Sequence, residues 1–312
     1  MDLIRTEEIS KRYGNFVALD HISISVPKGS IFGLLGPNGA GKTTFIRIIN
    51  QIIAPDHGTV LFNGEALKPQ HTDKIGYLPE ERGLYKKMKA GEQAIYLARL
   101  KGVPQHEAVS RLKYWFKKFD IQNWWDKKVE ELSKGMQQKI QFIITILHRP
   151  ELLIFDEPFS GFDPINVDLV KNEILRLKDE GASIIFSTHN MESVEQLCDN
   201  IALIHQSKVV LSGRVNEIKS QFSQNLFEIE SPQHDINSII PLLPQGIHYK
   251  NTESNTSMYK HYFKLDTNLG HNDLLKSLLP YMPIVGFHEL LPSMHDIFVS
   301  TIQNGSLSEN QI

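Results

Sequence analysis

One octapeptide constrains the fold of this chain more than any other segment. It reads Gly36-Pro37-Asn38-Gly39-Ala40-Gly41-Lys42-Thr43 and matches the pattern G-x-x-x-x-G-K-[ST]. A short apolar run precedes it at residues 30–35, and a helical pattern follows at residues 42–50. Glycines let the backbone curl until successive N–H groups point inward, and the helix adds the positive end of its dipole. This context of strand, loop and helix predicts a phosphate-binding loop.

The residue types within this loop indicate separate tasks. Lys42 is predicted to neutralise the β- and γ-phosphates of a nucleotide, and Thr43 to offer its hydroxyl to Mg²⁺. A Gly-rich turn that matches by accident is the alternative, and such a match arises in roughly one chain in a hundred of this length. The predicted nucleotide-binding set comprises Gly36, Pro37, Asn38, Gly39, Ala40, Gly41, Lys42, Thr43 and Thr44.

Length and composition set wider limits. A chain of 312 residues allows two domains, and a net charge of −3 argues against a nucleic-acid-binding protein. A single cysteine, Cys198, rules out an intrachain disulfide. The early charges in residues 1–8 argue against a signal peptide, and no apolar run approaches the roughly 18 residues that cross a bilayer. Any role at a membrane is therefore expected to come through a partner.

Apolar runs alternate with helical patterns over the first part of the chain. Residues 75–78, 152–155 and 183–186 are typical of buried strands, and residues 87–147 are mostly helical in pattern. Strands that alternate with helices favour a mainly parallel sheet covered by helices. We therefore expect an α/β domain at residues 1–220, with a mixed sheet and a helical subdomain at about 87–150.

The pattern changes after residue 220. Strand-like segments lie at 225–230, 259–265 and 284–288, and helix-like segments at 235–243 and 272–279. The order strand, helix, strand, strand, helix, strand predicts a small ferredoxin-like α+β domain. We expect this accessory domain to span residues 221–312, and its sequence indicates no ligand.

Two carboxylates follow the buried strand at residues 152–155. Asp156 is placed to hold Mg²⁺, directly or through water, and Glu157 to activate an attacking water as general base. Taken alone, the pair is explained equally well by a strand that emerges into solvent. The phosphate loop upstream in the sequence favours the functional interpretation.

Several further motifs resemble those of the ABC transporter ATP-binding subunits. Leu132-Ser133-Lys134-Gly135-Met136-Gln137 is similar to the family signature LSGGQ, and Ser160-Gly161-Phe162-Asp163 to its D-loop. His189 follows Ser187-Thr188 as the switch histidine does, and Tyr13 resembles the aromatic residue that stacks on adenine. Each feature has an ordinary alternative, such as a helix N-cap at Ser133. Their co-occurrence in family order favours the resemblance, which covers residues 1 to about 220.

The resemblance implies an ABC ATPase domain that works as a head-to-tail dimer. ATP would lie between Lys42 of one chain and Ser133 and Gly135 of a second copy. Asp163 would communicate across that interface. The implied catalytic residues are Glu157, His189, Lys42 and Glu80, and the implied cofactors are ATP and Mg²⁺.

The sequence departs from the family pattern at two places. Lys134 and Met136 replace the usual glycine and glutamine of the signature, and Glu80 stands where the Q-loop glutamine is expected. A carboxylate at this position can also ligate Mg²⁺ or its water, so Glu80 joins Thr43 and Asp156 as a predicted metal ligand. We expect Arg82 to offset the added negative charge.

Residues 77–85 and 132–139 look most like the bacterial ABC-2 export subgroup, within it the sodium-extruding NatA type. This implies a cytoplasmic motor at the inner face of the membrane, attached to a separate ABC-2 permease. The helical region at 87–130 would receive a permease helix. Its aromatic residues could line that groove, but core packing is the favoured interpretation. They are Trp115, Phe116, Phe119, Trp124 and Trp125.

Three other functions compete with this interpretation. A soluble ABC ATPase of translation or DNA repair would carry two motif sets, a coiled-coil insertion or zinc-binding cysteines, and none is present. A non-catalytic ABC-like regulator fits poorly with intact Lys42, Asp156 and Glu157. A GTPase would need a guanine-reading N-K-x-D stretch, which is missing. The sequence therefore predicts an ATPase subunit of an exporter without nucleic-acid partners.

Overall fold

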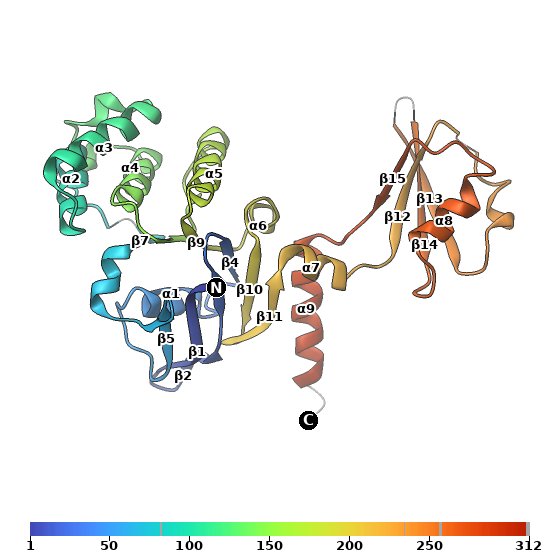
Figure 1. The fold of residues 1–312 in the computed structure, drawn as a ribbon, viewed down its shortest axis with the longest axis horizontal. Coiled ribbons are helices and arrows are strands. Elements are labelled where there is room, and N and C mark those ends of the chain that lie inside the picture. Colours follow the sequence, from blue (N-terminus) through green and yellow to red (C-terminus); the bar gives the residue numbers. More distant parts are fainter. Residues whose placement is uncertain (82, 234, 256–257, 310–312) are drawn as a thin grey trace. The chain divides into compact units, whose positions relative to one another are not determined.

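The computed structural model describes residues 1–81, 83–233, 235–255 and 258–309, with the backbone alone at residues 255 and 304–309. The chain divides into two compact units, Met1–Val215 with Thr301–Ile312, and Asn216–Ser300 (Figure 1). The accessory domain expected at residues 221–312 stays a prediction.

A six-stranded sheet forms the centre of the first unit. Its order is β11-β10-β4-β9-β8-β7, with parallel pairing from β10 to β7 and an antiparallel β11 at the edge. Every residue of β4, β8 and β9 is buried, as expected for parallel strands covered on both faces. This confirms the predicted mainly parallel sheet. The strands are β4 Ile31–Leu35, β7 Ile75–Leu78, β8 Leu152–Asp156, β9 Ser183–Thr188, β10 Asn200–His205 and β11 Lys208–Arg214.

A second, antiparallel sheet packs against the first through a shared core. Its order is β2-β1-β5-β6, and β3 pairs with β1. Helix α1 (Lys42–Ile49) buries Phe45, Ile46 and Ile49 in a core that includes Ile4 of β1 and Phe32 of β4. The helix after the phosphate loop is thereby fixed between both sheets. The strands are β1 Asp2–Tyr13, β2 Phe16–Ile22, β3 Ser25–Pro27, β5 His57–Phe62 and β6 Glu65–Ala66.

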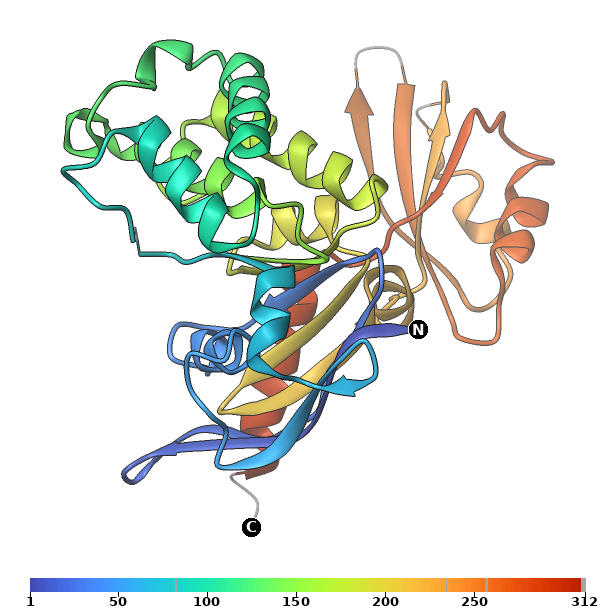
Figure 2. The same cartoon turned by 60° about the vertical axis from the view of Figure 1, so that its left-hand side comes forward.

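Helices α2, α3 and α4 form the predicted helical subdomain, drawn in green shades in Figure 2. Trp115, Phe116 and Phe119 are buried, so they are core residues, as the favoured interpretation held. Trp124 and Trp125 are half-buried. The helices of this unit are α2 Ala90–Leu100, α3 Gln105–Lys118, α4 Lys134–Ile146, α5 Pro164–Asp179 and α6 Met191–Leu197, with 3₁₀ turns at Pro69–Lys74, Gln122–Trp124 and Val129–Glu131; α7 Val215–Gln221 leads into the second unit.

The second unit is a four-stranded antiparallel sheet with order β13-β14-β12-β15. Strand β14 lies between β12 and β13 and is antiparallel to both, which is the split arrangement of the predicted ferredoxin-like fold. The elements are β12 Leu226–Ser231, β13 Ile247–Asn255, β14 Met258–Leu265, β15 Gly286–Glu289 and α8 His271–Leu278; α9 Met294–Glu309 begins in this unit and ends in the first.

The helix predicted at residues 235–243 is wrong. The structure has only a 3₁₀ turn at Ile240–Leu242, with Pro241 in its first turn. Leu243, before Pro244, is extended with φ −68° and ψ 138°. The ring of a proline disfavours helical geometry in the residue before it, so the helix cannot continue. The predicted order includes one strand for which no range was given. It is β13, which lacks a clean alternation of apolar residues.

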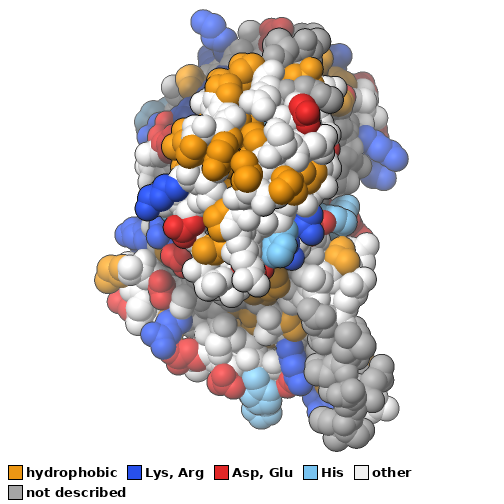
Figure 3. Space-filling view, turned by 90° about the vertical axis from the view of Figure 1, so that its right-hand side faces the viewer, with side chains coloured by type: hydrophobic (Ala, Val, Ile, Leu, Met, Phe, Trp, Pro, Cys, Tyr) orange, Lys and Arg blue, Asp and Glu red, His pale blue; other side chains and the backbone are white. Residues whose placement is uncertain are grey.

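Apolar side chains gather on one face of the second unit, which Figure 3 turns toward the viewer. A separate apolar core lies inside this unit, where Phe227, Ile229 and Phe263 pack with Leu274 and Leu278 of α8. The connection from α8 to β15 supplies much of the exposed apolar surface. The exposed large apolar residues of this unit are Leu242, Leu279, Tyr281, Val285 and Leu291.

Among the described residues, no helix combines the length and apolar character that crossing a bilayer requires.

Replacement of Phe142 by alanine should destabilise the first unit by about 3–5 kcal/mol. The ring of Phe142 is fully buried and lies 6.0 Å from the ring of Phe119 and 5.5 Å from the ring of Phe155. These contacts join the helical subdomain to β8. Urea unfolding followed by tryptophan fluorescence reports on this unit, because all 3 tryptophans lie in it.

The matched control is Leu100→Ala, at a side chain that is 62% exposed on α2. It should change the free energy of unfolding by less than about 0.5 kcal/mol. Equally small effects of both substitutions would contradict the core described above.

Candidate functional site

The predicted site residues follow four neighbouring parallel strands. β4, β9, β8 and β7 are adjacent in this order and run in one direction. Their carboxyl ends therefore meet at one edge of the sheet, the usual ligand position in such folds. The phosphate loop follows β4, and His189 follows β9. Asp156 is the last residue of β8, Glu157 follows it, and Glu80 follows β7.

The phosphate loop has backbone conformations that only glycine adopts without strain. Gly36, Gly39 and Gly41 have φ angles of 147°, 82° and 111°. A Cβ atom on Gly36 would lie 2.2 Å from the carbonyl oxygen of Ile204, and one on Gly41 would lie 2.4 Å from that of Ala18. Gly41 caps α1 without a side-chain hydrogen bond, so the helix begins in the loop with its N–H groups available to an anion.

Lys42 is the central cation of the site and is only 7% exposed. Its Nζ donates hydrogen bonds to the carbonyl oxygens of Gly36 at 2.7 Å and Pro37 at 3.1 Å. Burial lowers the pKa of Lys42, and the charges of Glu157, Asp156 and Glu80 oppose this shift. The structure therefore brings three predicted carboxylates around the predicted phosphate-binding lysine.

Asp156 is 2% exposed, and its Oδ2 atom has no hydrogen-bond partner among the described residues. Burial raises the pKa of Asp156, and the nearby charges of Glu80 and Glu157 add to the rise, whereas Ser187 and Lys42 lower it. A buried carboxylate oxygen without a partner is costly unless it is paired or coordinates a cation. Asp156 thus fits a metal-binding role, and Thr43 lies half-buried in the first turn of α1.

Glu157 is held by the end of β9. Its Oε1 accepts hydrogen bonds from the backbone N–H of His189 at 3.1 Å and from Nδ1 of the same residue at 2.7 Å. Its Oε2 accepts one from Oγ1 of Thr188 at 3.3 Å. Thr188 was missing from the predicted site, although it precedes His189 in the quoted motif.

The backbone of Glu157 is also unusual, with φ 48° in the left-handed region. A non-glycine residue in this region stores strain that the surrounding structure must hold, and such residues cluster at active sites. The side chain of Glu157 is 16% exposed, so solvent can reach the carboxylate from one side. The side chain of His189 is 71% exposed and lies open to solvent.

Glu80 is exposed at the end of β7, where its charge acts on both Lys42 and Asp156. The structure therefore places it with the phosphate loop and the carboxylates, as predicted from the Q-loop position. Arg82, expected to offset its charge, lies outside the described residues.

The signature and D-loop residues meet each other. Ser133 is the N-cap of α4, and its Oγ accepts a hydrogen bond from the N–H of Met136 at 3.3 Å. A Cβ atom on Gly135 would lie 3.3 Å from the carbonyl oxygen of Gly161. Asp163 caps α5 through the N–H of Asn166 at 3.0 Å. In the part of the chain that is described, no hydrogen bond or ion pair joins these residues to the phosphate loop.

Tyr13 lies at the tip of the β1–β2 hairpin and is 47% exposed. Its cross-strand partner Phe16 is 58% exposed, and Nζ of Lys11 lies 5.9 Å from the centre of the Tyr13 ring. Phe16 was not among the residues predicted from the sequence. Its position directly after the turn could have indicated that it pairs with Tyr13 across the hairpin. The hairpin thus offers two open aromatic rings for stacking.

A second group of potential metal ligands lies on the sheet of the second unit. The ligand atoms of Glu228, Glu230 and His288 lie within 4.8 Å of one another. Nζ of Lys260 is 2.8 Å from a carboxylate oxygen of Glu228 and 3.4 Å from one of Glu230. This ammonium group already pairs with both carboxylates and occupies the position a cation would take, so the cluster does not resemble a metal centre.

Comparison with known proteins agrees with these features. Residues 19–160 match the family described as ABC transporter, and residues 213–302 match the ATP-binding protein DrrA1-3-like, C-terminal domain. The ABC transporter ATP-binding protein YhaQ of Bacillus subtilis is 41% identical over 305 residues, which cover 96% of this chain and 98% of that protein. The ATP-binding protein NatA of the same organism is 35% identical over 214 residues, covering 67% of this chain and 87% of NatA.

A solved structure of an ATP-binding subunit of an ABC transporter is also similar. It superposes with a TM-score of 0.66 at 30% identity, over 70% of this chain and 93% of that one. The likeness to YhaQ is thus higher and longer than the expected likeness to NatA. The chain belongs to the ABC transporter ATP-binding proteins of the DrrA-like, ABC-2 export type, and it is the ATPase subunit of such a transporter.

Proposed function

We propose that ATP is hydrolysed at the edge of the sheet where β4, β9, β8 and β7 end. The observation that carries this proposal is the position of Lys42 among the carboxylates of Asp156, Glu157 and Glu80. Lys42 and the loop N–H groups bind the phosphates, and Tyr13 stacks on the base. Glu157 is the general base, because it is partly exposed and fixed by three hydrogen bonds from Thr188 and His189.

Mg²⁺ fits the same edge of the sheet. Asp156 has a buried oxygen without a partner, and Thr43 and Glu80 add hydroxyl and carboxylate oxygens, the ligand types this ion prefers. Mg²⁺, when bound, neutralises charge that develops on the transferred phosphoryl group. His189 contacts the γ-phosphate and orients the water that Glu157 activates.

A second copy of the chain completes the site. Ser133 is exposed at the start of α4, with Gly135 in the first turn, and the helix dipole there favours an anion. Among the described residues, no hydrogen bond or ion pair joins these groups to the phosphate loop of their own chain. We therefore propose a head-to-tail dimer in which the γ-phosphate bridges Lys42 of one copy and Ser133 of the other, with Asp163 at the interface. Loss of that bridge on hydrolysis opens the dimer.

The motor works with a membrane permease, as ABC ATPase subunits do. We propose an ABC-2 permease, which places the chain in the cytoplasm at the inner face of the membrane. The likeness to NatA supports export, but the cargo is held by the permease. Sodium is therefore not assigned.

Glu157→Gln should bind ATP normally, lower the rate of hydrolysis by about 10²-fold or more, and accumulate ATP-bound dimers. The amide keeps the shape of the side chain but cannot accept a proton. Phosphate release and size-exclusion chromatography with ATP measure the two effects. Ordinary turnover in this variant would exclude Glu157 as the base.

Lys42→Ala should abolish tight ATP binding, since the main cation of the loop is removed. Equilibrium binding of a fluorescent ATP analogue provides the measurement. Lys28→Ala is the control, because this lysine precedes the amino end of β4, whereas the phosphate loop follows the carboxyl end of that strand. This variant should bind as the parent does. Affinity retained in Lys42→Ala would mean that the loop is misassigned.

A further inference from the structure

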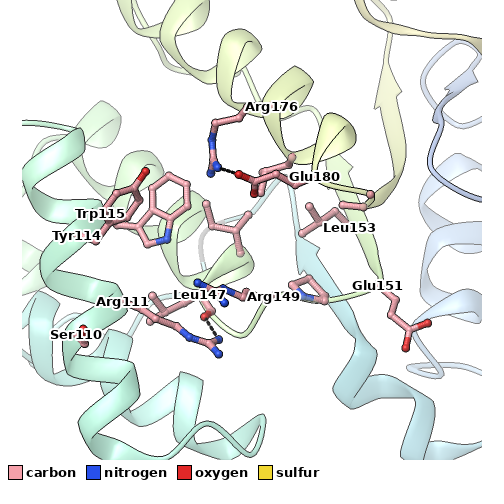
Figure 4. A pocket seen from close by; sticks show the side chains of 15 residues that line it. Ser110, Arg111, Tyr114, Trp115, Leu147, Arg149, Glu151, Leu153, Arg176 and Glu180 are labelled. Carbon is pink, nitrogen blue, oxygen red and sulfur yellow. Dashed lines mark hydrogen bonds and ion pairs between the residues drawn. The ribbon is translucent and has the colours of Figure 1, made fainter.

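A cavity of about 820 Å³ lies within the first unit. It is bounded by α3, the residues that follow α4, the start of β8 and the last turns of α5 (Figure 4). Glu151 and Leu153 contribute from the amino end of β8, whereas Asp156 ends the same strand. The cavity therefore belongs to the end of β8 opposite the nucleotide site.

One wall of the cavity is fixed by paired charges. Glu173 is only 4% exposed and forms ion pairs with both Lys118 of α3 and Arg176 of α5. The ring of Trp115 has Lys118 at 5.2 Å and Arg176 at 5.3 Å from its centre. Arg176 also pairs with Glu180. These contacts join α3 to α5, so this wall of the cavity is preformed. The positive charge of Arg176 is already neutralised by its carboxylate partners.

Arg111 lines this cavity and has one buried donor without a partner among the described residues. Its Nη1 donates a hydrogen bond to the carbonyl oxygen of Leu147 at 2.8 Å, and Nη2 pairs with the carboxylate of Glu107 (Figure 4 shows the first). Its Nε–H group is buried and has no acceptor among the described residues. A buried donor without an acceptor is unfavourable, so an oxygen atom brought by a ligand would be stabilised there.

Arg149 supplies the unbalanced charge. The residue has φ 57°, in the left-handed region, and its side chain extends into the cavity (Figure 4). The two lining carboxylates are already paired with other cations, Glu151 with Lys74 at 2.9 Å and Glu180 with Arg176. Of the three lining arginines, all within the described chain, Arg149 alone has no carboxylate partner.

The rest of the lining is largely apolar and includes Tyr114, Trp115, Leu147 and Leu153. Cavities of roughly 300–1,000 Å³ with apolar walls and a few placed polar groups are typical small-molecule sites. A guanidinium group binds the oxygens of a phosphate or carboxylate through paired hydrogen bonds.

We propose that this cavity binds a small organic anion. Its phosphate or carboxylate oxygens are held by Arg149 and by Nε–H of Arg111, and its apolar body lies against Trp115 and Leu147. The proposal does not depend on the assigned catalytic roles, because the site uses none of those residues.

Octyl phosphate is a suitable probe, with binding measured by calorimetry on the full chain. All variants carry Lys42→Ala, which removes most binding at the phosphate loop. In this background Arg149→Gln should weaken binding about tenfold or more. Arg99→Gln, an exposed arginine of α2 away from the cavity, is the matched control and should bind as the parent does. Circular dichroism checks that both variants are folded.

Two further probes separate the parts of the proposal. Inorganic phosphate lacks the apolar body and octanol lacks the anion, so each should bind at least about tenfold more weakly than octyl phosphate. Octyl phosphate should also change the tryptophan fluorescence, because Trp115 lines the cavity. Equal affinity in Arg149→Gln and Arg99→Gln, or octanol binding as tightly as octyl phosphate, would overturn the proposal.

Discussion

The parallel pairing of β7, β8, β9 and β4 is the interaction on which the site depends. Backbone hydrogen bonds fix the register of these strands, with Asp156 beside Ser187 and Leu35 beside Thr188. The ends of the strands are therefore held together before any side chain makes a contact. Residues from four distant parts of the sequence meet at this edge because the ladder places them there.

Electrostatics at this edge is poised for a charged ligand. Lys42 loses solvation through burial, which lowers its pKa, while three carboxylates favour its charged form. Burial and the acidic neighbours of Asp156 both disfavour its ionised form, so they raise its pKa. A metal ion and a polyphosphate together bring the positive and negative charge that these groups lack, so binding relieves a cost already built into the fold.

The positions of the motifs along the fold could be predicted from the sequence because the motifs are local and their order is specific. The loop from Gly36 to Thr43 and the pair Asp156–Glu157 were placed correctly against the strands that carry them. Long-range packing could not be predicted in this way. The cavity around Arg149 and the hydrogen bond from Thr188 to Glu157 arise from contacts between distant segments. The false helix at 235–243 shows that apolar spacing misleads where prolines such as Pro241 and Pro244 control the backbone.

The claim that two copies share each nucleotide is tested most directly by mixing two inactive variants. Lys42→Ala loses the phosphate loop and Gly135→Asp loses the signature, so each alone should hydrolyse little ATP. In a mixed dimer one site has both elements intact, and random pairing of equal amounts leaves about a quarter of all sites active. We predict that ATPase activity recovers toward this fraction on mixing. A mixture of folded variants that stays as inactive as its components would contradict the shared site.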